Sequence, residues 1–255
     1  MDKLTIIKVG GKVVEEPESL NTLLNQIHSV SGNKILIHGG GRTATEIAAK
    51  LGIKTKMVDG RRITDEETLE VVTMVYGGLI NKRIVAGLQA RNCKAVGLTG
   101  ADLDLIRAKK RPVNKIDYGF VGDVDDVNTR ELRMLINENV VPVIAPLTHD
   151  GKGNILNTNA DTIASEIAIE LSNHYNVYLF YCFEKSGVLL NSEDDTTVIH
   201  DLDSDLFEQY QKEDVINAGM IPKLDNGFRA KRKGVKEVLI TNPENIITGR
   251  GTRLV

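Results

Sequence analysis

Short apolar runs alternate with longer amphipathic segments along nearly all of the 255-residue chain. Short runs rich in Val, Ile and Leu are typical of buried strands, and the spacing of apolar residues between them is typical of helices. Strands are expected at residues 4–9, 34–38, 94–98, 140–145, 176–182 and 236–241. Helices are expected at residues 17–29, 43–51, 65–90, 130–138, 160–171, 204–211 and 224–232. The alternation predicts an α/β protein built around a mostly parallel sheet.

Three local patterns refine this outline. Thr64 and Glu67 form a T-x-x-E capping box at the start of the helix expected at 65–90. Residues 112–127 read PVNKIDYGFVGDVDDV, and their Gly and Asp residues at turn spacing predict hairpins outside the main sheet. A fresh series of strands and helices follows residue 172, so we expect one lobe at 1–172 and a second at 173–255.

Charge and cysteine content narrow the class of partner. The formal net charge is -3, from 32 Lys and Arg against 35 Asp and Glu, so the chain lacks the basic field that binds nucleic acid or an anionic membrane. Cys93 and Cys182 have no companion at metal-binding spacing and are expected to be reduced core thiols. No leader pattern is present, and no apolar run approaches the roughly 18 residues of a membrane span. We expect a cytoplasmic protein with a small-molecule partner.

Glycines follow three of the expected strands. Lys8 and Val9 lead into Gly10 and Gly11, and residues 34–43 read KILIHGGGRT, a strand, a glycine cluster and the start of a helix. Residues 96–102 read VGLTGAD. Backbone N–H groups at such strand ends bind anions, and no GxxxxGK[ST] sequence is present, so the pattern predicts an anion site that is not a P-loop. Taken alone, Lys8 fits a strand-end lysine that reaches solvent, and His38 fits a hydrogen-bonded core residue as well as a functional one.

Four further polar residues are candidates for a functional site, and three of them also have a plain structural interpretation. Arg62 would bind a carboxylate through two N–H groups or lie on the surface as an ordinary cation. Asn157 precedes Asp161, which would position lysines or simply complement the dipole of the helix that it begins. Lys223 lies beside the proline that opens a helix and would be functional or a surface lysine.

Taken together, these segments resemble the amino acid kinase family from one end of the chain to the other. The match is closest to the members that phosphorylate an N-acylated glutamate. The motifs that carry the resemblance are IIKVGG, HGGG, GRRIT, VGLTGAD, YGFVGDV, NTNAD, SGVL, AGMIPK and GRGTRLV, in that order. The resemblance implies an open αβα sandwich of the carbamate kinase-like fold. In it, the N-terminal lobe binds the acylated amino acid and forms the dimer contact, and the C-terminal lobe binds ATP.

The resemblance also implies a reaction. The γ-phosphoryl group of MgATP would pass to the side-chain carboxylate of an N-acyl-L-glutamate, with N-acetyl-L-glutamate the first choice, giving the 5-phosphate and ADP in arginine biosynthesis. A carboxylate is already a nucleophile, so catalysis consists largely of positioning and charge stabilisation. Mg²⁺ would be held mostly by phosphate oxygens and water, with no metal-ligating residues of the protein's own.

Site roles follow from the resemblance position by position. Lys8 and Lys223 match the lysines on either side of the transferring phosphoryl group, and Asp161 matches the residue that orients them. The other matching positions are Gly40, Gly41, Arg62 and Asn157 for the amino acid, Gly10 and Gly11 for phosphate, and Glu184, Lys185, Ser186, Gly187, Val188, Leu189, Val215, Ile216 and Asn217 for ATP. Glu184 departs from the family, which usually has Asp at this position.

Two alternatives and one assembly state complete the expectations. Arg61 occupies a position where the family commonly has an apolar residue, and Arg42 adds a further cation after HGGG. One of these arginines would pair with the second carboxylate of an N-succinyl-L-glutamate substrate. The plainer interpretation is that Arg61 faces solvent. A non-catalytic amino-acid or nucleotide sensor is the alternative from another class, although it would have no need of Lys8, Asp161 and Lys223 together. Because residue 4 already begins the first strand, the resemblance predicts a homodimer that arginine does not inhibit.

Overall fold

The central sheet runs through the whole molecule. The computed structural model describes residues 1–58, 61–216 and 219–255. Every neighbouring pair in the sheet is parallel except β13 with β14. In spatial order the strands are β12 (Asp201–Leu202), β14 (Thr252–Leu254), β13 (Glu237–Thr241), β11 (Asn176–Cys182), β1 (Lys3–Val9), β2 (Asn33–His38), β8 (Val141–Ile144) and β5 (Ala95–Leu98).

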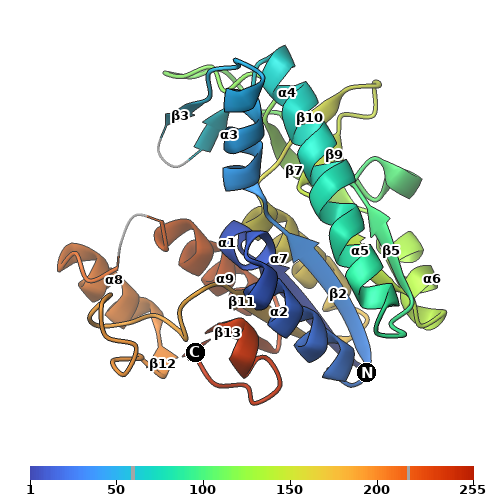
Figure 1. Cartoon of the computed structure of the whole chain (residues 1–255). Helices are drawn as coiled ribbons and strands as arrows, with labels where there is room; N and C mark the ends of the chain where they lie inside the picture. Colours follow the sequence, from blue (N-terminus) through green and yellow to red (C-terminus); the bar gives the residue numbers. More distant parts are fainter. Residues whose placement is uncertain (59–60, 217–218) are drawn as a thin grey trace.

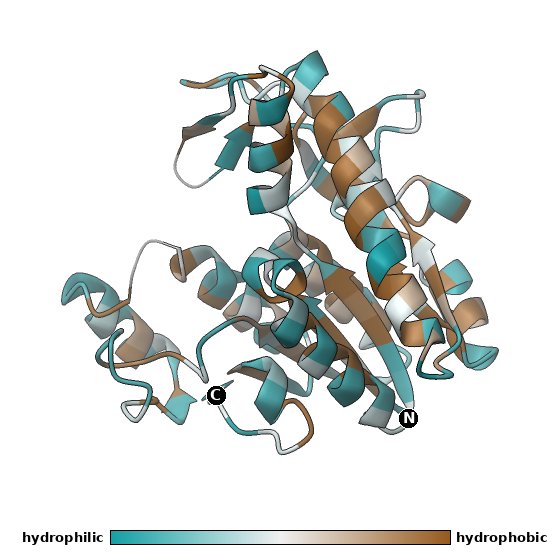
Figure 2. Cartoon of the chain, in the orientation of Figure 1, coloured by the Kyte–Doolittle hydropathy of each residue, from teal (hydrophilic) through white to brown (hydrophobic). Residues whose placement is uncertain are grey.

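Helices cover both faces of this sheet (Figure 1). One face carries α1 (Gly11–Glu15), α2 (Pro17–Ser29) and α5 (Asn81–Gln89). The helices η1 (Thr73–Ile80) and α4 (Glu66–Val72) extend the line of α5 past the strand ends, where α3 (Gly41–Lys50) lies beside them (Figure 1). The other face carries α6 (Thr129–Asn137), α7 (Ala160–Leu171), α8 (Ser204–Lys212) and α9 (Ile221–Arg232). The expected αβα sandwich is therefore confirmed. Figure 2 shows the central strands hydrophobic along most of their length, as burial on both faces requires.

The alternation of side chains along β1 sets the direction of Lys8. Leu4 and Ile6 belong to the apolar cluster that contains α7, whereas Ile7 and Val9 belong to the cluster on the opposite face. Because successive side chains of a strand point to opposite faces, Lys8 points to the same side as Leu4 and Ile6. Lys8 therefore faces α7.

A second, smaller sheet lies beyond the ends at which β1 and β2 finish (Figure 1). Its strands in spatial order are β10 (Ile155–Asn157), β9 (Leu147–His149), β6 (Ile106–Lys110) and β7 (Gly122–Val127). A separate hairpin pairs β3 (Lys56–Val58) with β4 (Arg61–Ile63). Short 3-10 turns occur at η2 (Asp102–Asp104) and η3 (Pro243–Asn245). The β6–β7 hairpin confirms the excursion that the sequence predicts outside the main sheet.

The helix expected at 65–90 differs from the prediction in two respects. Its middle, η1, is a π-helix rather than an α-helix. Its N-cap is Asp65, whose side chain accepts a hydrogen bond from the N–H of Thr68, so the predicted capping box of Thr64 and Glu67 is wrong. The reason is that Thr64 is engaged elsewhere: its N–H donates to the Tyr118 carbonyl and its own carbonyl accepts from Phe120 N–H.

The main sheet crosses the lobe boundary that the sequence predicts near residue 172. Strand β1, before that boundary, pairs with β2 on one side and with β11, after the boundary, on the other.

Among the described residues, one helical stretch, Glu66–Gln89, is long and apolar enough by length and composition to cross a membrane. Core helices pass the same test, and 44% of the apolar window of this stretch is buried. Cys93 and Cys182 are free and buried, in line with the prediction of core thiols.

Candidate active site

Two glycine turns lie against each other where β1 and β2 end. Gly10 N–H donates to the Cys182 carbonyl at 2.9 Å, and Gly39 N–H donates to the Val9 carbonyl at 3.0 Å. A Cβ placed on Gly39 would lie 3.3 Å from the backbone nitrogen of Gly11. A side chain at residue 39 would press on the backbone of the first turn, so glycine there permits the two turns to lie close together.

Gly40 has the most restrictive position in these turns. Its φ of 151° is a conformation that residues with a Cβ rarely adopt. A Cβ at Gly40 would also lie 2.2 Å from Cδ1 of Ile80, which is buried in η1. The second turn thus needs glycine at residue 40 for its backbone conformation and for its packing.

Three charged side chains meet in the interior next to these turns. Lys8 Nζ lies 2.8 Å from Oδ1 of Asp161, and Lys223 Nζ lies 3.2 Å from Oδ2 of the same carboxylate. Asn159 caps α7 through the N–H of Thr162, and this fixes Asp161 in the first turn of the helix. The backbone carbonyl of Asp161 accepts a hydrogen bond from the Tyr181 hydroxyl at 3.2 Å. We call Lys8, Asp161 and Lys223 the lysine–aspartate centre.

Burial and mutual attraction set the charges of this centre. Lys8 and Asp161 side chains are each only 7% exposed. Burial lowers the pKa of Lys8, Asp161 opposes that shift, and Lys223 adds to it, so the pKa lies below the ordinary lysine value. Burial by itself raises the pKa of Asp161, but the two ammonium groups together outweigh it and the pKa falls below its ordinary value. Asp161 is therefore an anion that holds two cations.

One cavity of about 440 Å³ lies beside Lys8 and Lys223, and we call it the nucleotide-side cavity. It contains most of the residues that the family resemblance assigns to phosphate and ATP: Gly10, Gly11, Glu184, Lys185, Gly187, Val188, Leu189, Val215 and Ile216. Ser186 instead lines a separate cavity with His200 and Arg253. The predicted contact at Asn217 lies outside the described residues.

A second cavity of about 210 Å³ holds the residues that the sequence assigns to the amino acid, and we call it the arginine pocket. Gly40, Gly41, Arg62 and Asn157 all line it. Arg62 is 8% exposed, and its Nη2 donates to the Gly41 carbonyl at 2.7 Å and to Thr45 Oγ1 at 2.9 Å. Its Nη1 is buried and has no hydrogen-bond partner among the described residues, so the guanidinium keeps one unsatisfied donor group at the wall of this pocket.

The lysine–aspartate centre stands between the two cavities. Ala160, which precedes Asp161, lines the arginine pocket, whereas Lys8 and Lys223 line the nucleotide-side cavity. A ligand group that reaches from either cavity toward Asp161 would meet the same two ammonium groups. The arrangement therefore suits transfer of an anionic group between two ligands.

The third glycine segment does not join this site. Thr99 N–H donates to the Asp102 carboxylate at 2.6 Å and Gly100 N–H donates to the Leu147 carbonyl at 2.6 Å, so the protein itself satisfies these donors. His38 belongs to the core: it is fully buried, its Nδ1 lies 2.8 Å from the Gly39 carbonyl, and its Nε2 lies 3.2 Å from Asn81 Nδ2. Burial lowers its pKa to about 4, so the imidazole is neutral.

Several residues of both cavities were not singled out from the sequence. The nucleotide-side cavity adds Lys12, Phe183, Ser192, Gly219 and Met220. The arginine pocket adds Met57, Tyr76, Arg111, Val121 and Thr158 among others. Arg111 is held by Asp123, and within the part of the chain that the structure describes its buried Nη1 has no hydrogen-bond partner, as in Arg62. Lys12 lies so close to Gly10 and Gly11 that its position in the chain was a usable signal.

Metal-ligating side chains do not gather at the site. Among the residues that the structure describes, no three His, Cys, Asp or Glu side chains come close enough to hold a metal ion. The Asp161 carboxylate is occupied by two lysines, and Glu184 is paired with Lys12. These contacts fit a metal ion that arrives with a phosphate ligand and takes most of its oxygen ligands from it.

Comparison with known proteins agrees with this geometry. The model of the "Amino acid kinase family" matches residues 3–242. The acetylglutamate kinase of Parabacteroides distasonis is 58% identical over 254 residues, covering 100% of both chains. In structure, smu.665 from Streptococcus mutans superposes with a TM-score of 0.84 at 24% identity, covering 99% of this chain and 98% of that one. The carbamate kinase from Giardia lamblia superposes with a TM-score of 0.71 at 14% identity, covering 100% of this chain and 98% of that one. This likeness confirms the predicted carbamate kinase-like fold.

Proposed function

The chain belongs to the amino acid kinase family, and on that premise we propose that it transfers the γ-phosphoryl group of ATP to the side-chain carboxylate of N-acetyl-L-glutamate. The products are the 5-phosphate of the acylated amino acid and ADP, and the reaction serves arginine biosynthesis. A full-length relative at 58% identity bears the name of this kinase. The observation that carries the proposal is the lysine–aspartate centre between an arginine pocket and a larger cavity.

The chemistry needs little beyond positioning. The acceptor carboxylate attacks the γ-phosphorus without a general base, and the bond from that phosphorus to the bridging oxygen of ADP breaks. Negative charge on the transferring group is stabilised by Lys8 and Lys223, and Asp161 keeps both ammonium groups in place. The Gly10 and Gly39 N–H groups already donate to the Cys182 and Val9 carbonyls, so the neutral donors of the two glycine turns would be the N–H groups of Gly11, Gly40 and Gly41.

The two cavities suit the two substrates. In this proposal Arg62 Nη1 and the Asn157 amide hold the α-carboxylate and the amide region of the acylated amino acid, and Gly40 and Gly41 line the path to the reacting carboxylate. ATP occupies the nucleotide-side cavity, where Val188, Leu189 and Ile216 are buried apolar residues suited to a base. Mg²⁺ accompanies the phosphates and offsets their charge when bound.

The proposed roles of the two lobes follow from the residues that line each cavity. Residues 1–172 contain every residue that lines the arginine pocket, and most of the nucleotide-side cavity comes from residues 173–255. We propose that the first lobe binds the acylated amino acid and forms a homodimer contact and that the second binds ATP. Exposed Met74 and Leu79 on η1, at 55% and 41%, support a contact surface on the first lobe. Buried free cysteines fit a cytoplasmic location.

Neither alternative from the sequence is favoured. Arg42 pairs with Glu46 on the surface of α3, and it is not among the residues of the arginine pocket, so it gives no support to a succinyl substrate. Arg61 does line that pocket but is exposed. The full-length relative is named for the acetyl compound. A silent sensor would not account for two lysines on one buried carboxylate.

A coupled assay of ADP release tests the proposal. Purified protein is given MgATP with N-acetyl-L-glutamate, with N-succinyl-L-glutamate, with unacylated glutamate, or with no acceptor, and hydroxylamine traps the acyl phosphate as a hydroxamate. We expect ADP and hydroxamate in equal amounts, fastest with the acetyl compound. ADP release without an acceptor, or none with either acyl compound, would contradict the proposed function. Light scattering with size exclusion measures the predicted dimer.

A further inference from the structure

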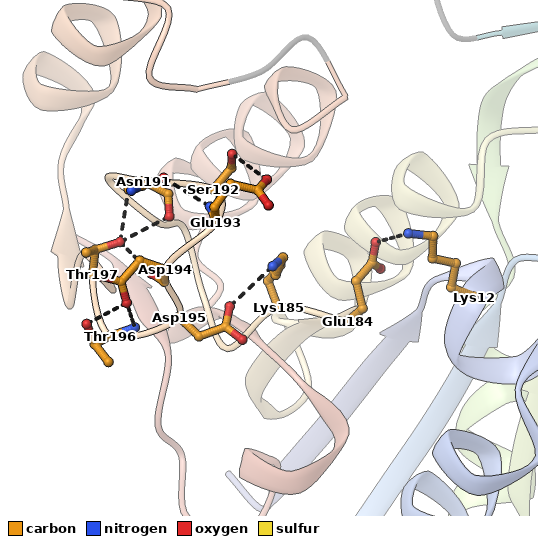
Figure 3. Close-up of polar contacts among 10 residues, drawn as sticks. All are labelled: Lys12, Glu184, Lys185, Asn191, Ser192, Glu193, Asp194, Asp195, Thr196 and Thr197. Atoms are coloured by element: carbon orange, nitrogen blue, oxygen red, sulfur yellow. Dashed lines mark hydrogen bonds and ion pairs between the residues drawn. The ribbon is translucent and has the colours of Figure 1, made fainter.

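Another lysine, Lys12, lines the nucleotide-side cavity and follows Gly10 and Gly11 in the chain. Its Nζ lies 3.1 Å from Oε1 of Glu184, and both residues line the cavity together with Lys8 and Lys223. Figure 3 shows Lys12 reaching from α1 toward Glu184, which lies on the segment that follows β11. The pair therefore joins two separate elements across the wall of the cavity.

The presence of Glu184 in this cavity needs an explanation. Burial raises the pKa of Glu184, but hydrogen bonding and the ammonium of Lys12 outweigh it, and the net pKa lies below its ordinary value. The carboxylate is thus ionised at neutral pH, in a cavity that the proposed function assigns to a polyphosphate. Like charges in one cavity repel, so an unpaired Glu184 would oppose nucleotide binding. Lys12 neutralises it.

The Lys12–Glu184 ion pair is also weak enough for Lys12 to exchange Glu184 for another anion. The Lys12 and Glu184 side chains are 54% and 45% exposed, and ion pairs of such exposure contribute little to stability. A lysine has a long, flexible stem and can turn its ammonium toward another anion within reach. A phosphate group offers more charge and more acceptor oxygens than one carboxylate. An arriving triphosphate would therefore compete well for Lys12.

We propose that Lys12 is a further phosphate-binding cation. Glu184 holds it against the cavity wall until ATP enters, and Lys12 then moves its ionic contact from Glu184 to the triphosphate. The inference rests on the proposed function and deepens it, because it adds a nucleotide contact on the side of the first lobe. It also assigns opposite roles to the two partners. Lys12 favours ATP binding, and Glu184 competes with it.

Calorimetric titration of MgATP into the protein, without an acyl acceptor, tests these opposite roles. Lys12→Met should weaken ATP binding about fivefold to tenfold, the loss of one exposed charge-assisted contact. Glu184→Gln should tighten it about twofold, because the competitor for Lys12 and a repelling charge are both removed. A pair that served only to join α1 to the segment after β11 would give changes in the same direction for both variants.

Lys109→Met supplies the matched control. Lys109 pairs with Asp125 in the β6–β7 hairpin and lines neither cavity, so its loss should leave ATP affinity unchanged. Weaker binding in Glu184→Gln, or unchanged binding in Lys12→Met, would overturn the inference. If the unaltered protein bound ATP and only the variants failed the expectation, the proposed function would stand. If the unaltered protein bound no ATP, the proposed function would fall, and this inference with it.

Discussion

Lys8 and Lys12 lie four residues apart, and each pairs with one carboxylate, yet their surroundings are opposite. Lys8 and Asp161 are 7% exposed each, and their charged atoms are 2.8 Å apart. Lys12 and Glu184 are 54% and 45% exposed, with 3.1 Å between the charged atoms. The strand holds Lys8 on the side of α7, whereas Lys12 follows the glycine turn at the start of a five-residue helix.

The difference shows how one residue type serves two purposes. A buried ion pair is costly to break, because the partner left behind is a charge without solvent. An exposed pair exchanges partners at little cost, because water and salt already screen it. The inner pair is therefore suited to hold a fixed geometry for phosphoryl transfer, and the outer pair is suited to receive a ligand that comes and goes.

Breaking the inner pair should have the largest effect. Asp161→Asn leaves two ammonium groups without their counter-charge, so we expect a loss of about 3 to 5 kcal/mol in the free energy of unfolding and a fall of at least 100-fold in kcat. Urea unfolding and the ADP-release assay measure the two quantities. Glu184→Gln is the matched change in the outer pair and should cost less than about 1 kcal/mol. Equal losses in the two variants would contradict the comparison.

His38 extends the comparison to a group that burial keeps uncharged. Its pKa falls from 6.5 to about 4 in the folded protein, so protons bind the unfolded chain more readily as pH falls from 6.5 toward 4. Stability is thus lost across that window, by about 3 kcal/mol at its lower end. His38→Gln keeps an acceptor for Asn81 and should remove this part of the pH dependence. Parallel stability curves for the two proteins from pH 7 to 4 would refute the assignment.

Arg62 and Arg61 repeat the contrast in the arginine pocket. Arg62 is buried and its Nη1 has no hydrogen-bond partner in residues 1–58, 61–216 and 219–255, whereas its neighbour Arg61 is exposed. Lysine cannot keep the contacts to Gly41 and Thr45 and also bind a ligand carboxylate. Arg62→Lys should therefore raise KM for N-acetyl-L-glutamate by about tenfold or more with KM for ATP unchanged. Arg61→Lys should change KM for N-acetyl-L-glutamate by less than about twofold. A larger rise of this KM in Arg61→Lys than in Arg62→Lys would contradict the assignment of the substrate carboxylate to Arg62.

The sequence predicted the parts of the fold that burial determines. Residues 176–182 form a β-branched and aromatic run with strands on both sides, and the strand is found with those bounds. β12 has two residues and β14 three, too few for a periodic pattern, and both were missed. Asp65 rather than Thr64 caps α4 because Thr64 is hydrogen-bonded to Tyr118 and Phe120, which lie more than 50 residues away.

Local sequence patterns predicted the site less completely than the fold. The alternation along β1 places Lys8 on the side of α7, but its pairing with Asp161 is a tertiary contact that local patterns do not contain. The resemblance to the family supplied that pairing as an expectation. Lys12 was missed although it directly follows Gly10 and Gly11. Arg111 was missed because nothing in its neighbouring residues distinguishes a cavity-lining cation from an exposed one. The third glycine segment was misinterpreted for another reason: Asp102, within the same VGLTGAD motif, accepts the Thr99 N–H that the prediction left for an anion.

The central claim is that Lys8 stabilises the transferring phosphoryl group rather than binding either substrate, and steady-state kinetics of Lys8→Met test it most directly. Both KM values and kcat are measured in the ADP-release assay, with circular dichroism as the control for folding. We expect kcat to fall by about 100-fold or more while KM for N-acetyl-L-glutamate and for ATP changes by less than about threefold. An unchanged kcat with a raised KM would show that Lys8 is only a binding group and would contradict the account.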